Sequence, residues 1–539
     1  SILPGVPSTP PIARRTAAME NICRIVLLAT ALGISACGPK SDEPATDEAN
    51  MPDPITSPFA ALPIDPPVAQ KRPVEIEQHG IKRIDNYGWM RDENWQEVLR
   101  DPGKLDADIR EHLEAENTYY ETATGDLEKL RERLFEEMRG RIKEDDSTVP
   151  AADGDFAYAV RFRDGGEYPI FVRTPRHGGD ETILYDGDLE GAGEDFFRIA
   201  AVDHSPNHEL IAYGVDRLGS EYYDIRIRTI ETGEEFEETI PSTGGSVVWA
   251  ADSKSFYYVE RDDNQRPKRV KHHVVGADSA DDRLVYEEPD DSYFLGIDKS
   301  QSGQYIFIGV RKGTSSEYRY LAADAEPGTQ PVLIAPRLED ELYSVEHAGD
   351  YFYIQTNAVD AVDFKIVRTP VSEPGRDNWE EWLPHEAGTY ISGFVPFEDR
   401  LVRLERENAL PRLVVSDYEQ EDVYEIDFDE AAYNLGLSPG YEFETSNLRF
   451  SYESPSTPEQ TFDFDMESRE RVLRKTQEVP SGHDAELYVV ERIFITADDG
   501  AEVPVTVLRL KTTPVDGTAP LLLYGYGSYG ATMQASFST

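Results

Sequence analysis

The chain has 539 residues, too many for one compact hydrophobic core, so two or more domains are expected. Its 53 Lys and Arg against 104 Asp and Glu give a formal net charge of -51, which excludes the basic patches that nucleic acids and anionic lipid headgroups need. A cationic ligand fits this charge, as does a surface that is acidic only for solvation, and 39% hydrophobic residues support a folded core.

The N-terminal part of the sequence predicts export. After Met19, the apolar run Ile25–Ile34 is too short to span a bilayer and has the length of the hydrophobic region of a secretory signal. It ends at Cys37 after small residues, which resembles the lipobox of bacterial lipoproteins. We therefore expect residues 1–36 to be upstream residues and a signal peptide. Cys37 would then carry a lipid anchor in the outer membrane, facing the periplasm; an ordinary signal peptide with an incidental cysteine is the alternative.

A tether follows the signal. Cys23 and Cys37 are the two cysteines, so the mature chain has no pair to oxidise and must be stabilised by packing. Residues 37–70 are rich in Pro, Asp, Ala and Ser, a composition typical of a disordered segment.

Residues 71–149 predict helices. Apolar residues recur at spacings of three and four, which places each set on one helix face. The first set is Leu105, Ile109, Leu113 and Tyr120, and the second is Leu127, Leu130, Leu134, Met138 and Ile142. We expect both faces to be buried. Gly125 and Asp126 between the sets predict a C-cap followed by an N-cap.

Residues 150–475 predict a β-propeller. A polar turn followed by an apolar strand recurs at Ser205–Tyr213, Ala250–Tyr258 and Ser300–Ile308, with offsets of 45 and 50 residues. This is the period of propeller blades, and dividing the segment by it predicts about seven blades. Alternating patterns at Tyr223–Arg228 and Asp363–Arg368 fit half-buried second strands.

Residues 476–539 predict the start of another domain. Asp499 and Gly500 lie between two alternating segments and indicate a hairpin from about Glu491 to Leu508. The continuous apolar run Leu521–Tyr524 is typical of a strand buried on both faces of an α/β sheet.

Several motifs, in chain order, resemble the prolyl oligopeptidase family and its oligopeptidase B branch in particular. They are His79–Gly80, Arg83–Tyr87, Trp89–Asp92, Tyr452–Pro458 and Leu523–Gly530. The resemblance implies a serine peptidase whose α/β-hydrolase domain, built from both chain ends, is capped by a seven-bladed propeller that admits only short peptides. It also implies cleavage after Arg or Lys, with no cofactor. The expected fold is therefore a propeller plus an incomplete α/β-hydrolase domain with N-terminal helices.

The catalytic triad is expected outside this sequence. Hydrolase folds present Ser, Asp and His in that order after the early strands, which places all three beyond Thr539 and makes the chain as given inactive. Ser438 lies in a G-x-S-x-G pattern, but we infer no apolar strand before it, and Pro439 followed by Gly440 cannot open a helix. We therefore predict that Ser438 is not the nucleophile.

The histidine pairs predict no metal site. His204 with His208, and His272 with His273, could bind a metal only with further ligands, which the spacing does not show. Surface or core positions are the preferred interpretation for each.

The resemblance assigns three site residues. Tyr526 would donate its hydroxyl to the oxyanion, although it could instead cap a sheet edge, and packing is favoured for Tyr524 and Tyr529. Gln534 and Ser536 stand where bacterial oligopeptidase B has an acidic pair that binds a second basic substrate residue. Neither side chain ionises, so we expect a weakened preference for dibasic peptides. The alternative function is a lipid-anchored propeller that binds peptides without catalysis.

Overall fold

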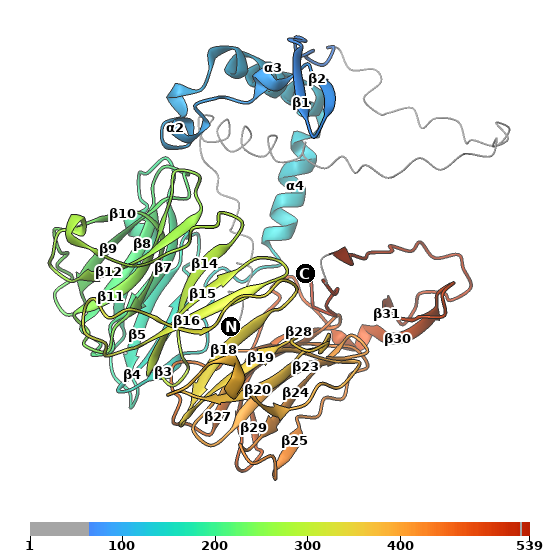
Figure 1. Cartoon of the computed structure of the whole chain (residues 1–539). Helices are drawn as coiled ribbons and strands as arrows, with labels where there is room; N and C mark the ends of the chain where they lie inside the picture. The colour runs from blue at the N-terminus through green and yellow to red at the C-terminus, as the bar shows by residue number, and fades with distance from the viewer. Residues whose placement is uncertain (1–63, 529–530) are drawn as a thin grey trace. The chain divides into compact units, whose positions relative to one another are not determined.

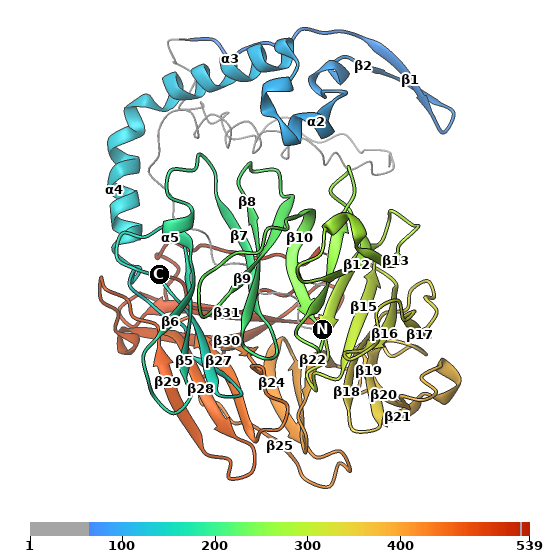
Figure 2. The same cartoon turned by 90° about the vertical axis from the view of Figure 1, so that its left-hand side faces the viewer.

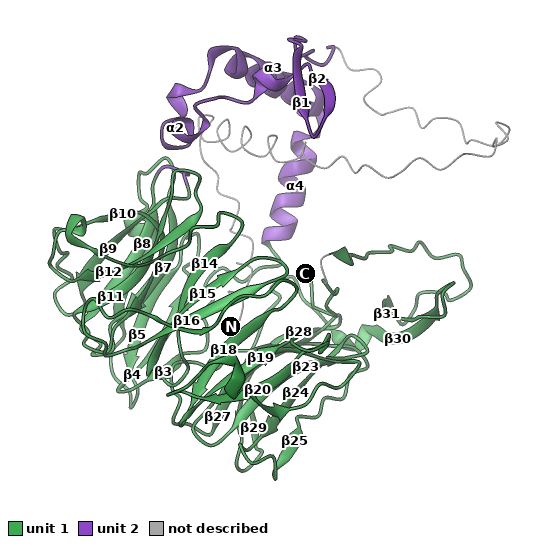
Figure 3. Ribbon diagram, viewed as in Figure 1, with its two compact units in different colours: residues 1–10, 140–217, 221–539 green, residues 11–139, 218–220 purple. Residues whose placement is uncertain are grey.

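Antiparallel pairing between strands that follow one another in the sequence builds most of the structure. The structure is a computed structural model, and it describes residues 64–528 and 531–539. The chain divides into two units, shown in Figure 3. One unit comprises residues 1–10, 140–217 and 221–539, and the other comprises residues 11–139 and 218–220. The expected signal peptide, the expected lipidation site Cys37 and the expected tether up to residue 63 lie outside the described residues.

Between residues 64 and 139, the smaller unit contains a hairpin, three α-helices and three short 3-10 helices. Its elements are β1 (Val74–Gln78), β2 (Ile81–Asp85), η2 (Gly88–Met90), α2 (Trp95–Arg100), η3 (Pro102–Lys104), α3 (Ala107–Thr124), η4 (Gly125–Leu127) and α4 (Glu128–Arg139). The two helices expected from the apolar spacing are thus confirmed as α3 and α4. Asp106 caps α3, because its carboxylate accepts hydrogen bonds from the backbone N–H groups of Asp108 and Ile109.

Two expectations for these helices are wrong. Gly125 is the C-cap of α3, as expected, with a right-handed φ of -57°, but the chain continues directly into η4, so Asp126 lies inside η4 and is not an N-cap. The second apolar set is exposed by 38 to 60%, although Ile109 of the first set is buried. An apolar stripe specifies which face can be buried, whereas burial needs a packing partner, and the described residues provide none for this face.

The larger unit is a β-propeller (Figures 1 and 2). Its first sheet contains β3 (Ala151–Asp153), β4 (Phe156–Arg161), β5 (Ile170–Pro175) and β6 (Thr182–Asp186), followed by α5 (Gly187–Glu190). The second contains β7 (Arg198–His204), β8 (Leu210–Asp216), β9 (Tyr223–Thr229), β10 (Ile240–Trp249), β11 (Ser255–Arg261), β12 (Pro267–Val274) and β13 (Arg283–Glu287).

Four further sheets have four strands each. The third contains β14 (Phe294–Lys299), β15 (Tyr305–Arg311), β16 (Ser316–Ala322) and β17 (Val332–Ala335). The fourth contains β18 (Tyr343–Ala348), β19 (Tyr351–Thr356), β20 (Lys365–Pro370) and β21 (Glu380–Leu383). The fifth contains β22 (Thr389–Pro396), β23 (Leu401–Glu407), β24 (Leu410–Ser416) and β25 (Val423–Glu425). The sixth contains β26 (Asn434–Leu437), β27 (Asn447–Ser454), β28 (Thr457–Asp465) and β29 (Arg471–Thr476).

The blade count differs from the expected seven. The described residues form five four-stranded blades and one seven-stranded sheet. Strand β10 explains the difference, because its N-terminal part pairs with β9 at Ile240 and Thr243, and its C-terminal part pairs with β11 from Val247 to Trp249. The pairing register shifts between these parts, so one long strand belongs to two neighbouring groups of strands.

The repeated turn and strand of the sequence is confirmed. The strands predicted after each polar turn are β8, β11 and β15, and the predicted second strands are β9 and β20. Each turn is closed by the same backbone hydrogen bond, from Ser205 to Leu210, from Ala250 to Ser255 and from Ser300 to Tyr305, at 2.9 to 3.0 Å. The period therefore reports one structural unit that is repeated around the propeller.

Apolar side chains bury the faces between neighbouring sheets. Between the third and fourth sheets, for example, Phe307 of β15 packs in one cluster with Val345 and Phe352 of β18 and β19. The fifth and sixth sheets share a cluster that includes Phe450, which is 0% exposed. Each sheet therefore depends on its neighbours for burial.

The hairpin after the propeller is confirmed, and the strand expected next is not formed. Strands β30 (Tyr488–Thr496) and β31 (Glu502–Leu510) pair in register around Gly500, whose φ is +87°. The run Leu521–Tyr524 is irregular and 75 to 89% exposed, because no described strand pairs with it. The expected start of an α/β-hydrolase domain therefore stays a prediction. Among the described residues, no helix is long and apolar enough to cross a membrane.

Strand β10 passes so close to β8 that position 214 in β8 has no room for a side chain. A Cβ atom at Gly214 would overlap the backbone carbonyl of Gly245. We expect Gly214→Ala to lower the free energy of unfolding by about 3 kcal/mol, because two backbones have to separate. Urea unfolding monitored by tryptophan fluorescence measures it. The control is Gly296→Ala in β14, where the new methyl group meets nothing within 4 Å, so a change of less than about 0.5 kcal/mol is expected. Equal effects of the two variants would contradict this interpretation.

Candidate functional site

The C-terminal segment carries the site residues assigned from the sequence. Tyr526 lies in irregular chain after β31 and is 55% exposed. Gln534 donates a hydrogen bond to the backbone carbonyl of Thr532 over 3.3 Å, and the Ser536 hydroxyl accepts one from the Asn434 amide over 3.3 Å. The segment after residue 530 therefore lies against β26 of the last sheet.

Glu453 joins this segment to the propeller. Its two carboxylate oxygens accept hydrogen bonds from the Asn434 side chain at 3.1 Å and from the Phe537 backbone at 3.1 Å. The Glu453 carboxylate of β27 thus lies close to Ser536. Ser536 is one of the two positions where the resemblance predicts an acidic residue and this sequence has none. Sequence reasoning missed Glu453 because it belongs to a propeller strand 83 residues before Ser536.

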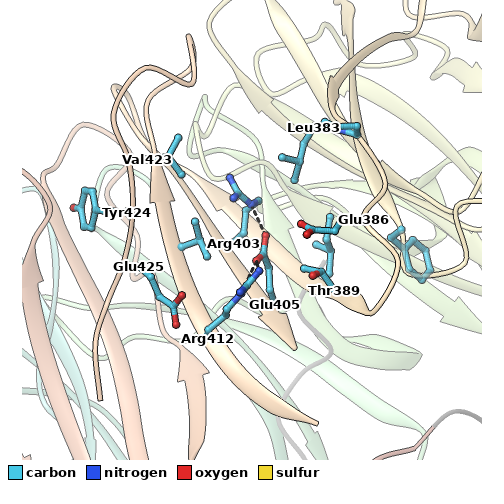
Figure 4. A pocket seen from close by; sticks show the side chains of 13 residues that line it. Leu383, Glu386, Thr389, Arg403, Glu405, Arg412, Val423, Tyr424 and Glu425 are labelled. Atoms are coloured by element: carbon cyan, nitrogen blue, oxygen red, sulfur yellow. Dashed lines mark hydrogen bonds and ion pairs between the residues drawn. The ribbon is translucent and has the colours of Figure 1, made fainter. Parts of the chain in front are cut away.

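A pocket of about 300 Å³ opens between the fourth and fifth sheets (Figure 4). Apolar side chains such as Ile391 and Val414 form part of its wall. A chain of charged groups crosses it, because Glu405 accepts hydrogen bonds from Arg403 at 2.8 Å and from Arg412 at 2.9 Å. Arg403 and Glu405 are 5% and 3% exposed, so this network is a buried one.

Two further carboxylates line the pocket without belonging to this network. They are Glu386 and Glu425, shown at the rim in Figure 4. Burial and the neighbouring charges of Asp427 and Glu405 raise the pKa of Glu425, against the opposing effect of Arg412. A cation or a hydrogen-bond donor would relieve this accumulation of negative charge. The sequence signals this network only through LVRLERE at 401–407, where Arg403 and Glu405 each follow an apolar residue in the same strand.

Neither Ser438, considered from the sequence, nor Ser302, which the structure places beside a histidine, lies in a catalytic arrangement. Ser438 follows strand β26, so the expectation that no strand precedes it is wrong, but the chain continues into a loop and then β27 and forms no helix after it. Ser302 bonds His347 at 2.8 Å, yet His347 is 1% exposed and is enclosed by the rings of Tyr305 and Phe352. A substrate carbonyl cannot reach that imidazole.

The two histidine pairs lie in different surroundings. His272 and His273 are 3% and 0% exposed on β12, and His273 bonds Asp282 at 2.7 Å, which confirms core positions for them. His204 bonds Asp153 at 2.7 Å, and His208 bonds the hydroxyl of Tyr158 at 2.8 Å. Asp153 is a third group beside this second pair, which the sequence spacing did not reveal.

The fold and the family comparison together define the class of protein, the propeller domain of a peptidase. A family described as "Prolyl oligopeptidase, N-terminal beta-propeller domain" matches residues 66–477, which include the strands of all six propeller sheets. The chain belongs to the prolyl oligopeptidase family.

Relatives and solved structures agree with this assignment. The chain is 37% identical over 506 residues to dipeptidyl aminopeptidase BI of Pseudoxanthomonas mexicana, covering 90% of this chain and 68% of the relative. It is 31% identical to protease 2 of Moraxella lacunata, covering 87% and 67%. The structure of oligopeptidase B from Leishmania major superposes with a TM-score of 0.81 at 27% identity, covering 88% of this chain and 69% of that one. The chain thus matches about two thirds of each peptidase.

The buried charge network of the pocket gives a stability prediction. We expect Glu405→Gln to lower the free energy of unfolding by about 3 kcal/mol, because the buried guanidinium group of Arg403 and the partly exposed one of Arg412 lose their shared carboxylate. Urea unfolding at neutral pH measures it. The matched control is Glu407→Gln on the same strand, whose carboxylate is 52% exposed and contacts Arg412 alone in the network, so a loss below about 1 kcal/mol is expected. An unchanged free energy of unfolding in Glu405→Gln would show that the network contributes no stability.

Proposed function

We propose that this chain supplies the propeller and part of the active site of a serine peptidase that cleaves short peptides after Arg or Lys. The observation that carries the proposal is the family match over residues 66–477, together with relatives whose names describe peptidases. The net charge of -51 supports a basic substrate, because a negative field attracts cationic peptides. The propeller acts in this proposal as a size filter.

In this proposal the catalytic triad of the peptidase comes after Tyr526 in the sequence. Hydrolase folds order the triad as Ser, Asp and His after the early strands of the sheet. Residues 527–539 contain neither Asp nor His. The 539-residue chain alone is therefore expected to be inactive.

Tyr526 is the proposed oxyanion donor. Its phenol follows Gly525 and precedes Gly527, so little bulk flanks it, and a Cβ atom at either glycine meets nothing within 4 Å. A hydroxyl held there can stabilise the negative charge that develops on the substrate carbonyl. The motif from Leu523 to Gly530 supports this assignment.

Export and lipidation complete the proposal. The apolar run before Cys37 and the small residues next to it support a lipoprotein in the outer membrane, where periplasmic peptides would be the substrates. The second candidate function is a lipid-anchored propeller that binds peptides without catalysis, and it is favoured by the closed propeller that the described residues form on their own.

Labelling by a fluorophosphonate separates the two functions. We expect the 539-residue chain to remain unlabelled and a longer product of the same gene, which includes the residues encoded after Thr539, to be labelled stoichiometrically. The longer product should also hydrolyse fluorogenic peptides that end in Arg or Lys, with little gain for dibasic over monobasic substrates. Intact-mass measurement reports labelling. A stop codon directly after codon 539 would leave peptide binding without catalysis as the function. Labelling of the 539-residue chain would show that the nucleophile lies within it.

The role of Tyr526 is tested in that longer product. We expect Tyr526→Phe to lower kcat about 100-fold with a small change in KM, because the lost hydroxyl acts on the transition state. The matched control is Tyr524→Phe, two residues earlier and also exposed, for which a change below about threefold is expected. Steady-state kinetics on an arginyl peptide amide measures both. Equal kcat values for Tyr526→Phe and the unmodified enzyme would remove Tyr526 from the active site.

A further inference from the structure

Three metal-ligating side chains meet at the junction of the first and second sheets. Asp153 is the last residue of β3, His204 is the last residue of β7, and His208 lies in the turn between β7 and β8. One ligand atom from each lies within 4.8 Å of the others. Two imidazoles and one carboxylate are a donor set that transition metals such as Zn²⁺ bind in proteins.

The turn holds His208 in a defined position. Its φ is +60°, and its backbone N–H donates a hydrogen bond to the carbonyl of Ser205 over 2.8 Å. Arg173 donates a hydrogen bond to the His208 carbonyl from the neighbouring sheet. The imidazole is therefore presented by a closed turn that two sheets support.

Contacts with two tyrosine side chains orient the imidazoles of His204 and His208. The ring of Tyr158 stacks on His204 with centroids 3.7 Å apart and an interplanar angle of 7°, and Tyr441 packs edge-on against His204. The hydroxyl of Tyr158 lies 2.8 Å from Nδ1 of His208. When that nitrogen donates its proton to Tyr158, Nε2 of His208 has a free lone pair. Ligating histidines are commonly oriented by such a contact to the other ring nitrogen.

Glycine keeps the space beside His208 free of a side chain. Gly154 follows Asp153 with a φ of +57°, and a Cβ atom there would lie 3.0 Å from Nε2 of His208. A side chain at position 154 would therefore crowd Nε2, the nitrogen that Tyr158 leaves free. The glycine therefore keeps the approach from the β3–β4 turn clear.

We propose that Asp153, His204 and His208 bind one divalent transition-metal ion through a carboxylate oxygen and two imidazole nitrogens, with water completing the coordination. The hydrogen bond of 2.7 Å between His204 Nε2 and Asp153 is the contact that the ion would replace. Hard cations such as Mg²⁺ and Ca²⁺ fit less well, because they prefer all-oxygen sites. The ion would fasten β3 to the β7–β8 turn and thereby join two sheets.

This site is separate from the proposed peptidase chemistry. Its residues belong to the first two sheets, whereas Tyr526, Gln534 and Ser536 follow the last one. The inference therefore does not depend on the proposed function, and its test requires no peptidase activity.

The test uses the 539-residue chain, stripped of metal with a chelator and then titrated with Zn²⁺ and Co²⁺. We expect one Zn²⁺ per chain by elemental analysis and a visible Co²⁺ absorption band of a nitrogen- and oxygen-ligated site. Asp153→Asn and His208→Asn should each weaken Zn²⁺ binding by about tenfold or more. Asparagine tolerates the left-handed backbone of position 208 and keeps a hydrogen-bonding group at position 153.

Control variants separate this site from surface binding. His177→Asn removes an exposed imidazole in the turn between β5 and β6 and should leave the affinity unchanged. Tyr158→Phe should weaken binding less than the loss of a ligand, because it removes only the orienting hydroxyl. Circular dichroism and thermal unfolding of the metal-free variants check that each is folded. Failure of the stripped chain to bind Zn²⁺, or equal affinities for His208→Asn, His177→Asn and the unmodified chain, would overturn the proposal.

Discussion

Arg449 of β27 donates hydrogen bonds to the backbone carbonyls of Val149 and Pro150, at 3.0 and 2.8 Å, and so connects the last sheet to the chain that enters the first. Lys475 of β29 pairs with Asp146 over 2.7 Å at the same junction. A propeller buries the faces of its sheets only when its last sheet meets its first, because each sheet packs against two neighbours. These contacts between distant parts of the sequence close the ring on which every other feature of the larger unit depends.

Both sites described above exist because sheets are placed side by side. The pocket around Glu405 combines residues of the fourth and fifth sheets, and Asp153 reaches His204 only because the first sheet lies beside the second. The pocket collects side chains from strands of both sheets, and the histidine cluster collects them from strand ends and a turn. The inter-sheet junctions are therefore where this propeller has room for chemistry beyond its own stability.

The run Leu521–Leu523 behaves differently, because its apolar side chains have nothing described to pack against. Leu521, Leu522 and Leu523 are more than 80% exposed, and the second apolar face of the N-terminal helices is also exposed. Backbone groups in a strand need a partner strand, and an isolated apolar run cannot supply one. The buried sheet that this apolar run indicates therefore stays a prediction.

The sequence by itself determined the repeated unit of this protein, because the polar turn and apolar strand at Ser205, Ala250 and Ser300 are local patterns with a fixed period. It also determined the helices α3 and α4 and the hairpin around Gly500, whose signals lie within a few residues of one another. Only the tertiary structure decided that β10 joins two groups of strands, that Glu453 stands beside Ser536, and that Asp153 completes a set with His204 and His208. These features bring together residues far apart in the sequence, and no local pattern records which distant strand will pack against a given turn.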